Sequence, residues 1–133
     1  MCIRDRFRTL SKNPVACDEF VQPDAWKPGH ISLADWADVA LVAPASANTL
    51  AKMRMGLADN LLTSLLLAFT KKIYVAPAMN VGMWENPATQ ENLEVLKARG
   101  VTVIEPGEGF LACGVEGKGR MADPGEIVER LKG

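Results

Sequence analysis

Short apolar runs alternate along the chain with longer segments that mix apolar and polar residues, and two of the runs contain the same short sequence motif. Residues 41–45 (LVAPA) and 74–78 (YVAPA) each reach a proline that precedes small and polar residues. A short apolar run closed by proline is typical of the carboxyl end of a buried parallel strand, where pairing stops. We therefore predict strands at residues 39–42 and 72–76, and a third, β-branched strand at 101–104.

Helical patterns separate the predicted strands. Ser32, with Asp35 three residues later, resembles a capping box that opens a short helix. His30 would then lie on a loop just before this helix. Leucines on nearly all sides of residues 59–69 predict a helix buried in the core or in a subunit interface. The other helices are expected at residues 46–55 with a cap at Gly56, from Asn86-Pro87 to Arg99, and from a capping box at Asp123 to near the chain end.

Strands that alternate with helices predict a parallel sheet between two helical layers. The fold class is therefore a three-layer α/β sandwich with a Rossmann-like (flavodoxin-like) sheet. The 133 residues correspond to a single domain, which we take as residues 1–133. No glycine-rich phosphate loop precedes the first predicted strand, so we expect a first βα unit to be missing. Residues 1–6 lack periodicity, and we expect them to be foreign to the natural protein.

Composition narrows the classes of partner. The formal net charge is −1 and no run of Lys or Arg occurs, which favours neither nucleic acid nor an anionic membrane. The longest apolar stretch, around residues 65–69, is far too short to span a bilayer. Three cysteines without paired or metal-ligand spacing predict neither a disulfide framework nor a metal site. We therefore expect a soluble protein, with the cytoplasm as the default compartment.

Two polar segments follow the predicted strand ends, and the carboxyl ends of adjacent parallel strands face one crevice. Residues 46–49 (SANT) place hydrogen-bonding side chains at a helix start, which suits an anion or the polar edge of a planar cofactor. An ordinary helix cap explains them equally well. In residues 79–84 (MNVGMW), Asn80 can donate to a carboxylate while methionine and tryptophan exclude water. The alternative is a loop whose large side chains fill the core.

Two further residues carry candidate chemistry. Five of the eleven glycines lie within residues 106–120, which predicts a mobile lid or clamp. Cys113 lies inside this stretch, where a thiol can serve as a proton donor. A single cysteine is otherwise a small buried apolar residue. His30 is the only histidine, and it is either a general base or a solvated loop residue.

Taken together, these segments resemble the flavin-containing cysteine decarboxylase family. The resemblance rests on His30-Ile31, residues 44–49 (PASANT), residues 77–84 (PAMNVGMW) and residues 112–121 (ACGVEGKGRM), and it covers residue 7 to the end. Two departures stand out. The family's first strand and its FMN phosphate loop are absent, and Val115 replaces the Asp of many bacterial members.

The resemblance implies FMN as the cofactor and assigns a role to each matching residue. His30 and Cys113 would be catalytic, with the cysteine as proton donor. The implied FMN contacts are Ser46, Ala47, Asn48, Thr49 and Ala78, and the implied substrate contacts are Asn80, Met83 and Ala112.

Within the family, the motifs are most similar to those of the members that convert 4′-phosphopantothenoylcysteine to 4′-phosphopantetheine in coenzyme A biosynthesis. The resemblance also implies a homo-oligomer, either a trimer or a dodecamer. A related decarboxylase of peptidyl cysteine and a catalytically silent flavin-binding or regulatory subunit are the alternatives. Retention of His30, Asn80 and Cys113 together argues against the silent subunit.

Overall fold

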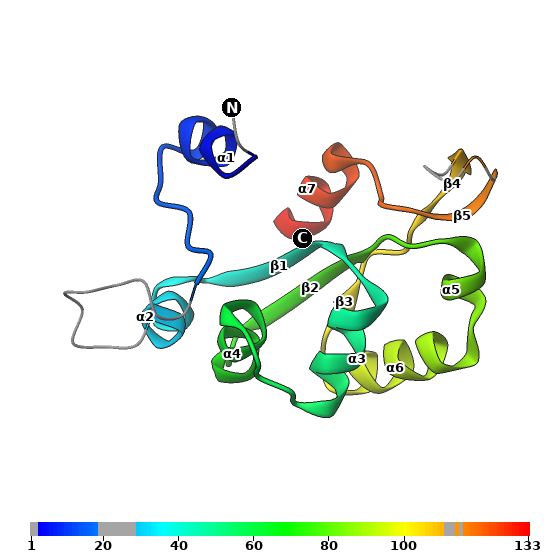
Figure 1. Cartoon of the computed structure of the whole chain (residues 1–133), viewed down its shortest axis with the longest axis horizontal. Coiled ribbons are helices and arrows are strands. Elements are labelled where there is room, and N and C mark those ends of the chain that lie inside the picture. The colour runs from blue at the N-terminus through cyan, green and yellow to red at the C-terminus, as the bar shows by residue number, and fades with distance from the viewer. Residues whose placement is uncertain (1–2, 19–28, 111–113, 115) are drawn as a thin grey trace.

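A parallel three-stranded sheet forms the centre of the molecule (Figure 1). The computed structural model describes residues 3–18, 29–110, 114 and 116–133. The strands are β1 (Val39–Ala45), β2 (Lys72–Pro77) and β3 (Thr102–Val103), in the order β1-β2-β3. Val42 pairs with Val75, and Tyr74 with Thr102. The predicted parallel α/β fold is confirmed.

Helices and a hairpin complete the described part of the chain. The helices are α1 (Ile3–Ser11), α2 (Gly29–Trp36), α3 (Ala47–Met55), α4 (Leu61–Ala68), α5 (Val81–Glu85), α6 (Pro87–Ala98) and α7 (Pro124–Lys132). β4 (Gly107–Phe110) and β5 (Glu116–Arg120) pair as an antiparallel hairpin. None of the helices in the described ranges is long and apolar enough to cross a membrane.

Alternate residues of the strands supply two separate cores. Val42 and Val75 face α3, α4 and α6, where they pack with Leu50, Leu66 and Leu93. On the other face of the sheet, a smaller cluster joins β2 to the C-terminal helix; its members are Tyr74, Ala76, Ile104, Ala122 and Ile127. Figure 1 shows the same layers, with α3, α4 and α6 on one side and α7 on the other. Both faces of the central strand β2 are buried, which explains why its sequence is a continuous apolar run and does not alternate with polar residues.

β1 is an edge strand among the described residues, and one of its faces is open. Val39 is 41% exposed and Leu41 is 38% exposed. Val42, on the opposite face of the same strand, is buried. The sequence of β1 is therefore apolar on both faces, although only one of these faces is packed in this structure.

Helix ends follow their local sequence closely. Gly56 ends α3 in the left-handed conformation with φ of 71°, as predicted. Asn86 caps α6 by accepting from the Ala88 N–H (2.9 Å). Asp123 caps α7 by accepting from the Gly125 N–H (2.8 Å). These starts and stops were predictable because capping depends on the side chain beside the helix and not on distant residues.

Two predictions about element boundaries are wrong. α2 begins at Gly29, so His30 lies in its first turn and Ser32 is an interior residue. Both apolar strands continue through their prolines, to Ala45 and Pro77. The predicted burial of α4 in the core or in a subunit interface stays a prediction for its outer face, where Leu67 is 62% exposed within one chain. A helix also spans Ile3–Ser11, and none of its residues is buried.

Two segments that the sequence left without regular structure are ordered. Residues 81–85 form the short helix α5, and the glycine-rich stretch forms most of the β4–β5 hairpin. The hairpin has no apolar alternation, and its glycines bring strand backbones close to neighbouring elements. The expected mobility of this stretch stays a prediction.

Candidate functional site

The loops that follow β1 and β2 are joined directly. The Ala78 N–H donates to the carbonyl oxygen of Ala45 (3.1 Å), and Ala45 pairs with Pro77 in the sheet. Ala45 and Pro77 are buried, so this junction is fixed by packing as well as by the hydrogen bond. We call residues 45–49 and 78–80 the strand-end site. The two loops that follow the strands are therefore adjacent, as predicted, and the shared crevice for their polar side chains stays a prediction.

The start of α3 supplies polar groups from small residues. Ser46 is the N-cap, and its Oγ accepts from the Thr49 N–H (3.2 Å) and lies 3.1 Å from Thr49 Oγ1. The first N–H groups of a helix, here those of Ala47 and Asn48, have no acceptor within the helix. Asn48 is exposed and Thr49 half-buried. Neutral hydroxyl, amide and N–H groups of this kind fit the carbonyl and N–H edge of a flavin ring.

Asn80 is held at the start of α5. Its Oδ1 accepts from the Gly82 N–H (2.8 Å), and this contact makes it the N-cap of the helix. The residue is exposed, next to the strand-end junction. The amide group of asparagine carries two N–H donors, which suit a substrate carboxylate.

Large side chains after Asn80 fix α5 in place. Trp84 is 6% exposed and belongs to the core beneath α3 and α6, and Met79 packs against the same core. Met83, which the sequence placed in the substrate site, is half-exposed at 49%. The core-filling interpretation therefore holds for Trp84, while Met83 has surface available for a ligand.

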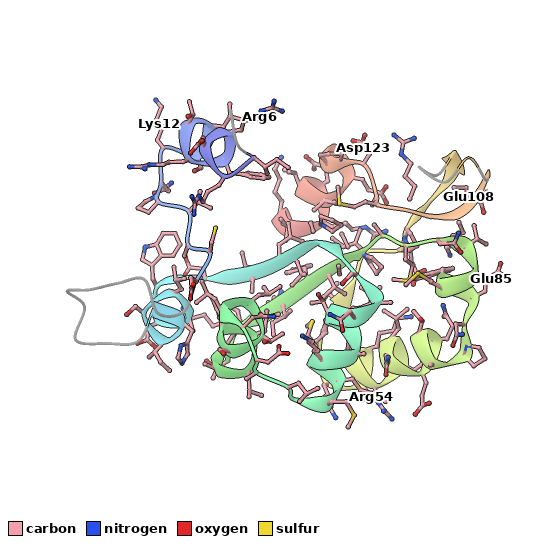
Figure 2. All side chains as sticks on the ribbon, viewed as in Figure 1. Arg6, Lys12, Arg54, Glu85, Glu108 and Asp123 are labelled. Atoms are coloured by element: carbon pink, nitrogen blue, oxygen red, sulfur yellow. The ribbon has the colours of Figure 1, made fainter. Side chains whose placement is uncertain are left out.

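The β4–β5 hairpin lies beside the Asn80 loop. The Met79 N–H donates to the Gly119 carbonyl oxygen (2.9 Å), and Lys118 Nζ lies 5.6 Å from the centroid of the Trp84 ring. Figure 2 shows the labelled Glu85 of α5 and Glu108 of β4 at the same end of the molecule. Cys113 and Ala112 follow β4 in the chain but lie outside the described residues.

His30 is not brought to this site within one chain. It lies, half-buried, in the first turn of α2, and α2 packs against α4. Figure 1 shows α2 and α4 at the end of the molecule away from α5 and the hairpin. The structure thus joins the loop that carries Ser46 and Thr49 to the loop that carries Ala78 and Asn80, and it places His30 at another end of the chain.

Sequence reasoning missed the contribution of β5. Lys118 and Gly119 contact the segment that carries Asn80, although the sequence motifs assigned no role to either residue. The signal was the alternation of glycine with charged residues at 116–120 (EGKGR), which is typical of a strand whose backbone approaches another element closely. Within the described residues, no group of three His, Cys, Asp or Glu side chains could hold a metal ion.

Comparison with known proteins defines the class of protein. The model of the Flavoprotein family matches residues 3–133. The chain belongs to the flavoprotein family, which confirms the prediction of a flavin protein.

Several similar proteins are named as decarboxylases or as coenzyme A biosynthesis proteins. The chain is 50% identical over 123 residues to a cysteine/cysteine sulfinic acid decarboxylase from an unknown prokaryotic organism, covering 92% of this chain and 34% of the relative. It is 47% identical over 123 residues to the coenzyme A biosynthesis bifunctional protein CoaBC of Bacillus subtilis, covering 92% and 30%. A probable phosphopantothenoylcysteine decarboxylase of Streptococcus mutans is 45% identical over 127 residues, with 94% and 71% covered.

Solved structures agree with these relatives. A PPC decarboxylase mutant complexed with pantothenoylaminoethenethiol matches with a TM-score of 0.84 and 42% identity, covering 90% of this chain and 69% of that one. The FMN-dependent cysteine decarboxylase SpaF matches with a TM-score of 0.83 and 30% identity, covering 98% and 70%. The chain spans about a third of the first two curated relatives, at 34% and 30% of their lengths. The relatives and solved structures named as decarboxylases include ones for cysteine or cysteine sulfinic acid and ones for phosphopantothenoylcysteine.

Proposed function

We propose that this chain forms the flavin-binding part of an FMN-dependent decarboxylase whose substrate is 4′-phosphopantothenoylcysteine and whose product is 4′-phosphopantetheine. Relatives that act in coenzyme A biosynthesis support this substrate. The observation that carries the proposal is the placement of Asn80. It caps α5 two residues after Ala78, whose N–H bonds to the carbonyl oxygen of Ala45 just before Ser46. This placement supports an amide group that would donate to a substrate carboxylate close to FMN at the start of α3.

FMN would lie against the start of α3. Ser46, Ala47, Asn48 and Thr49 would hold its polar edge, and Ala78, which has only a methyl side chain, would allow close approach. When bound, FMN supplies the two-electron oxidation that makes the substrate's thiol carbon an electron sink for decarboxylation, and it returns the electrons afterwards.

The chain's own residues would orient the substrate and move protons. Asn80 would donate to the substrate carboxylate, with Met83 and Ala112 beside it. Cys113 would donate the proton that completes the product, since a thiol titrates within reach of neutral pH. In the sequence Cys113 lies between β4 and β5, and Gly119 of β5 accepts a hydrogen bond from the Met79 N–H, next to Asn80.

A homo-oligomer, a trimer or a dodecamer, would bring in the remaining group. His30 lies away from Asn80 in one chain (Figure 1). A general base must come within hydrogen-bond reach of the proton that it moves. We therefore propose that His30 of one copy serves the strand-end site of another. Mixing inactive His30→Asn and Asn80→Asp proteins should restore activity by forming mixed assemblies, and no recovery would contradict this sharing.

The variant Asn80→Asp tests the proposed function. Aspartate is as good an N-cap as asparagine, so the Gly82 N–H keeps its acceptor and α5 should persist. The substitution removes an N–H donor and sets a negative charge against the substrate carboxylate. Loss of a hydrogen bond to a charged group costs about 1.5–3 kcal/mol, so kcat/KM should fall about 10- to 150-fold, and the charge repulsion adds to this loss.

Asn86→Asp is the matched control. Asn86 caps α6 through the same type of bond, to the N–H two residues later (2.9 Å). This variant should keep the parent rate of carbon dioxide release, and both variants should retain FMN. Near-normal turnover by Asn80→Asp, or equal losses in the two variants, would remove Asn80 from the substrate site.

A further inference from the structure

We propose that Gly117 is a positioning residue: its missing side chain lets β5 lie directly on α5 and fixes the base of the hairpin against the loop that carries Asn80. The link from this contact to catalysis rests on the proposed function. The contact between Gly117 and α5 does not depend on the proposed function, and it can be tested separately.

The approach of β5 to α5 leaves no room for a side chain at Gly117. A Cβ atom at this position would lie 2.7 Å from Cγ2 of Val81, and 3.7 Å and 3.8 Å from its Cγ1 and Cβ. Carbon atoms pack at about 3.5–4.0 Å, so the shortest of these distances is a clash. Val81 has little freedom to turn away, because a β-branched side chain in a helix strongly prefers one χ1 rotamer.

Contacts at the next two residues of β5 hold the same surfaces together. Lys118 lies over the Trp84 ring and within 3.3 Å of Glu105, and the Gly119 carbonyl oxygen accepts from the Met79 N–H (2.9 Å). Trp84 is nearly fully buried, so the surface that receives β5 is anchored in the core. Three successive residues of the strand therefore touch the segment 79–84.

Asn80 lies between two of these contacts in the sequence. Met79, just before it, bonds to Gly119, and Val81, just after it, packs on Gly117. Moving β5 away from α5 would therefore change the loop on both sides of Asn80. It would also change where the hairpin lies relative to that residue. Close packing of this kind tolerates an added methyl group poorly.

Gly107 on β4 provides a matched control in the same hairpin. A Cβ at Gly107 would meet no atom within 4 Å, and, as at Gly117, its backbone is outside the left-handed region. Gly107→Ala and Gly117→Ala thus make the same chemical change in one hairpin, and only the second creates a clash.

The test compares wild type with Gly117→Ala, Gly107→Ala, Val81→Ala and the double variant Gly117→Ala/Val81→Ala. Hydrogen exchange of the Met79 amide, followed by NMR, reports the bond to Gly119 without requiring any activity. We expect exchange to be about tenfold faster in Gly117→Ala, unchanged in Gly107→Ala, and close to wild type in the double variant. The value of kcat/KM should follow the same order.

Each outcome decides between the possibilities. Wild-type exchange in Gly117→Ala, an equal effect in Gly107→Ala, or no recovery in the double variant would overturn the proposed contact. Faster exchange with unchanged kcat/KM would overturn the positioning role. If Gly117→Ala does not fold, a folded double variant supports the contact and an unfolded one contradicts it. If the exchange pattern is as expected but wild type has no decarboxylase activity, the proposed function fails and the contact stands.

Discussion

Replacing Ser46 with alanine separates the structural role of the α3 cap from its role in binding FMN. The Ser46 hydroxyl accepts from the Thr49 N–H (3.2 Å) and lies 3.1 Å from the Thr49 hydroxyl. Loss of an N-cap costs about 1 kcal/mol of folding free energy. For a chain of this size, that loss corresponds to a fall in Tm of about 4 °C.

FMN binding should fall by more than the loss of stability accounts for. The variant removes one polar group from the proposed contact with the flavin and loosens the first turn, which carries Ala47 and Asn48. A net hydrogen bond contributes about 0.5–1.5 kcal/mol, so Kd for FMN should rise about two- to tenfold. Quenching of flavin fluorescence during titration measures Kd, and thermal unfolding followed by circular dichroism measures Tm.

Asn60→Ala is the control for this experiment. Asn60 caps α4 with the same pattern, because its Oδ1 accepts from the Thr63 N–H (3.0 Å) and lies 3.1 Å from the Thr63 hydroxyl. It is outside the strand-end site, so its replacement should lower Tm and leave Kd for FMN unchanged. Equal changes in Kd for the two variants, or none for Ser46→Ala, would refute the assignment of the α3 start to the flavin.

Two further predictions concern proton donors and a surface ion pair. The variant Cys113→Ser should release about one carbon dioxide per enzyme and then accumulate the dehydrogenated product, because a hydroxyl is a far weaker acid than a thiol. Mass spectrometry would identify the product. Formation of the fully reduced product at the parent rate would contradict the role of Cys113 as proton donor. The hydrogen bond from Lys52 holds the pKa of Asp59 below its ordinary value of 3.8. Because its pKa is lowered in the folded state, Asp59 stabilises the fold at pH values above 3.8, and this stabilisation is lost as the pH falls through the lowered pKa. The variant Lys52→Met should therefore raise the NMR titration midpoint of Asp59 and weaken the dependence of stability on acid pH.

The elements that sequence predicted correctly depend on short-range chemistry. The apolar runs at β1 and β2, the left-handed cap at Gly56 and the caps Asn86 and Asp123 are all set by neighbouring residues. The convergence of the two polar loops also follows from the sequence, because parallel strands place their carboxyl ends together.

The missed features depend on distant contacts. α5 has five residues, too few to show helical periodicity, and Trp84 holds it in place by packing into the core. The glycine-rich stretch becomes a hairpin because its strands pair with each other and Gly119 bonds to Met79. The separation of His30 from Asn80 also could not be predicted from the sequence. Each residue lies in a local motif, whereas the distance between α2 and α5 is set by the whole sheet.

The central claim, that the strand-end site supports FMN-dependent decarboxylation of a cysteine-derived carboxylate, is tested most directly by product analysis. The purified protein would be incubated with 4′-phosphopantothenoylcysteine labelled at the reacting carboxyl group, with and without FMN. Peptidyl cysteine and cysteine sulfinic acid would serve as competing substrates. We expect labelled carbon dioxide and 4′-phosphopantetheine in equal amounts, formed only with FMN and faster than the products of either competitor. No labelled carbon dioxide from any of the three substrates while FMN is bound, or release at the same rate without FMN, would contradict it.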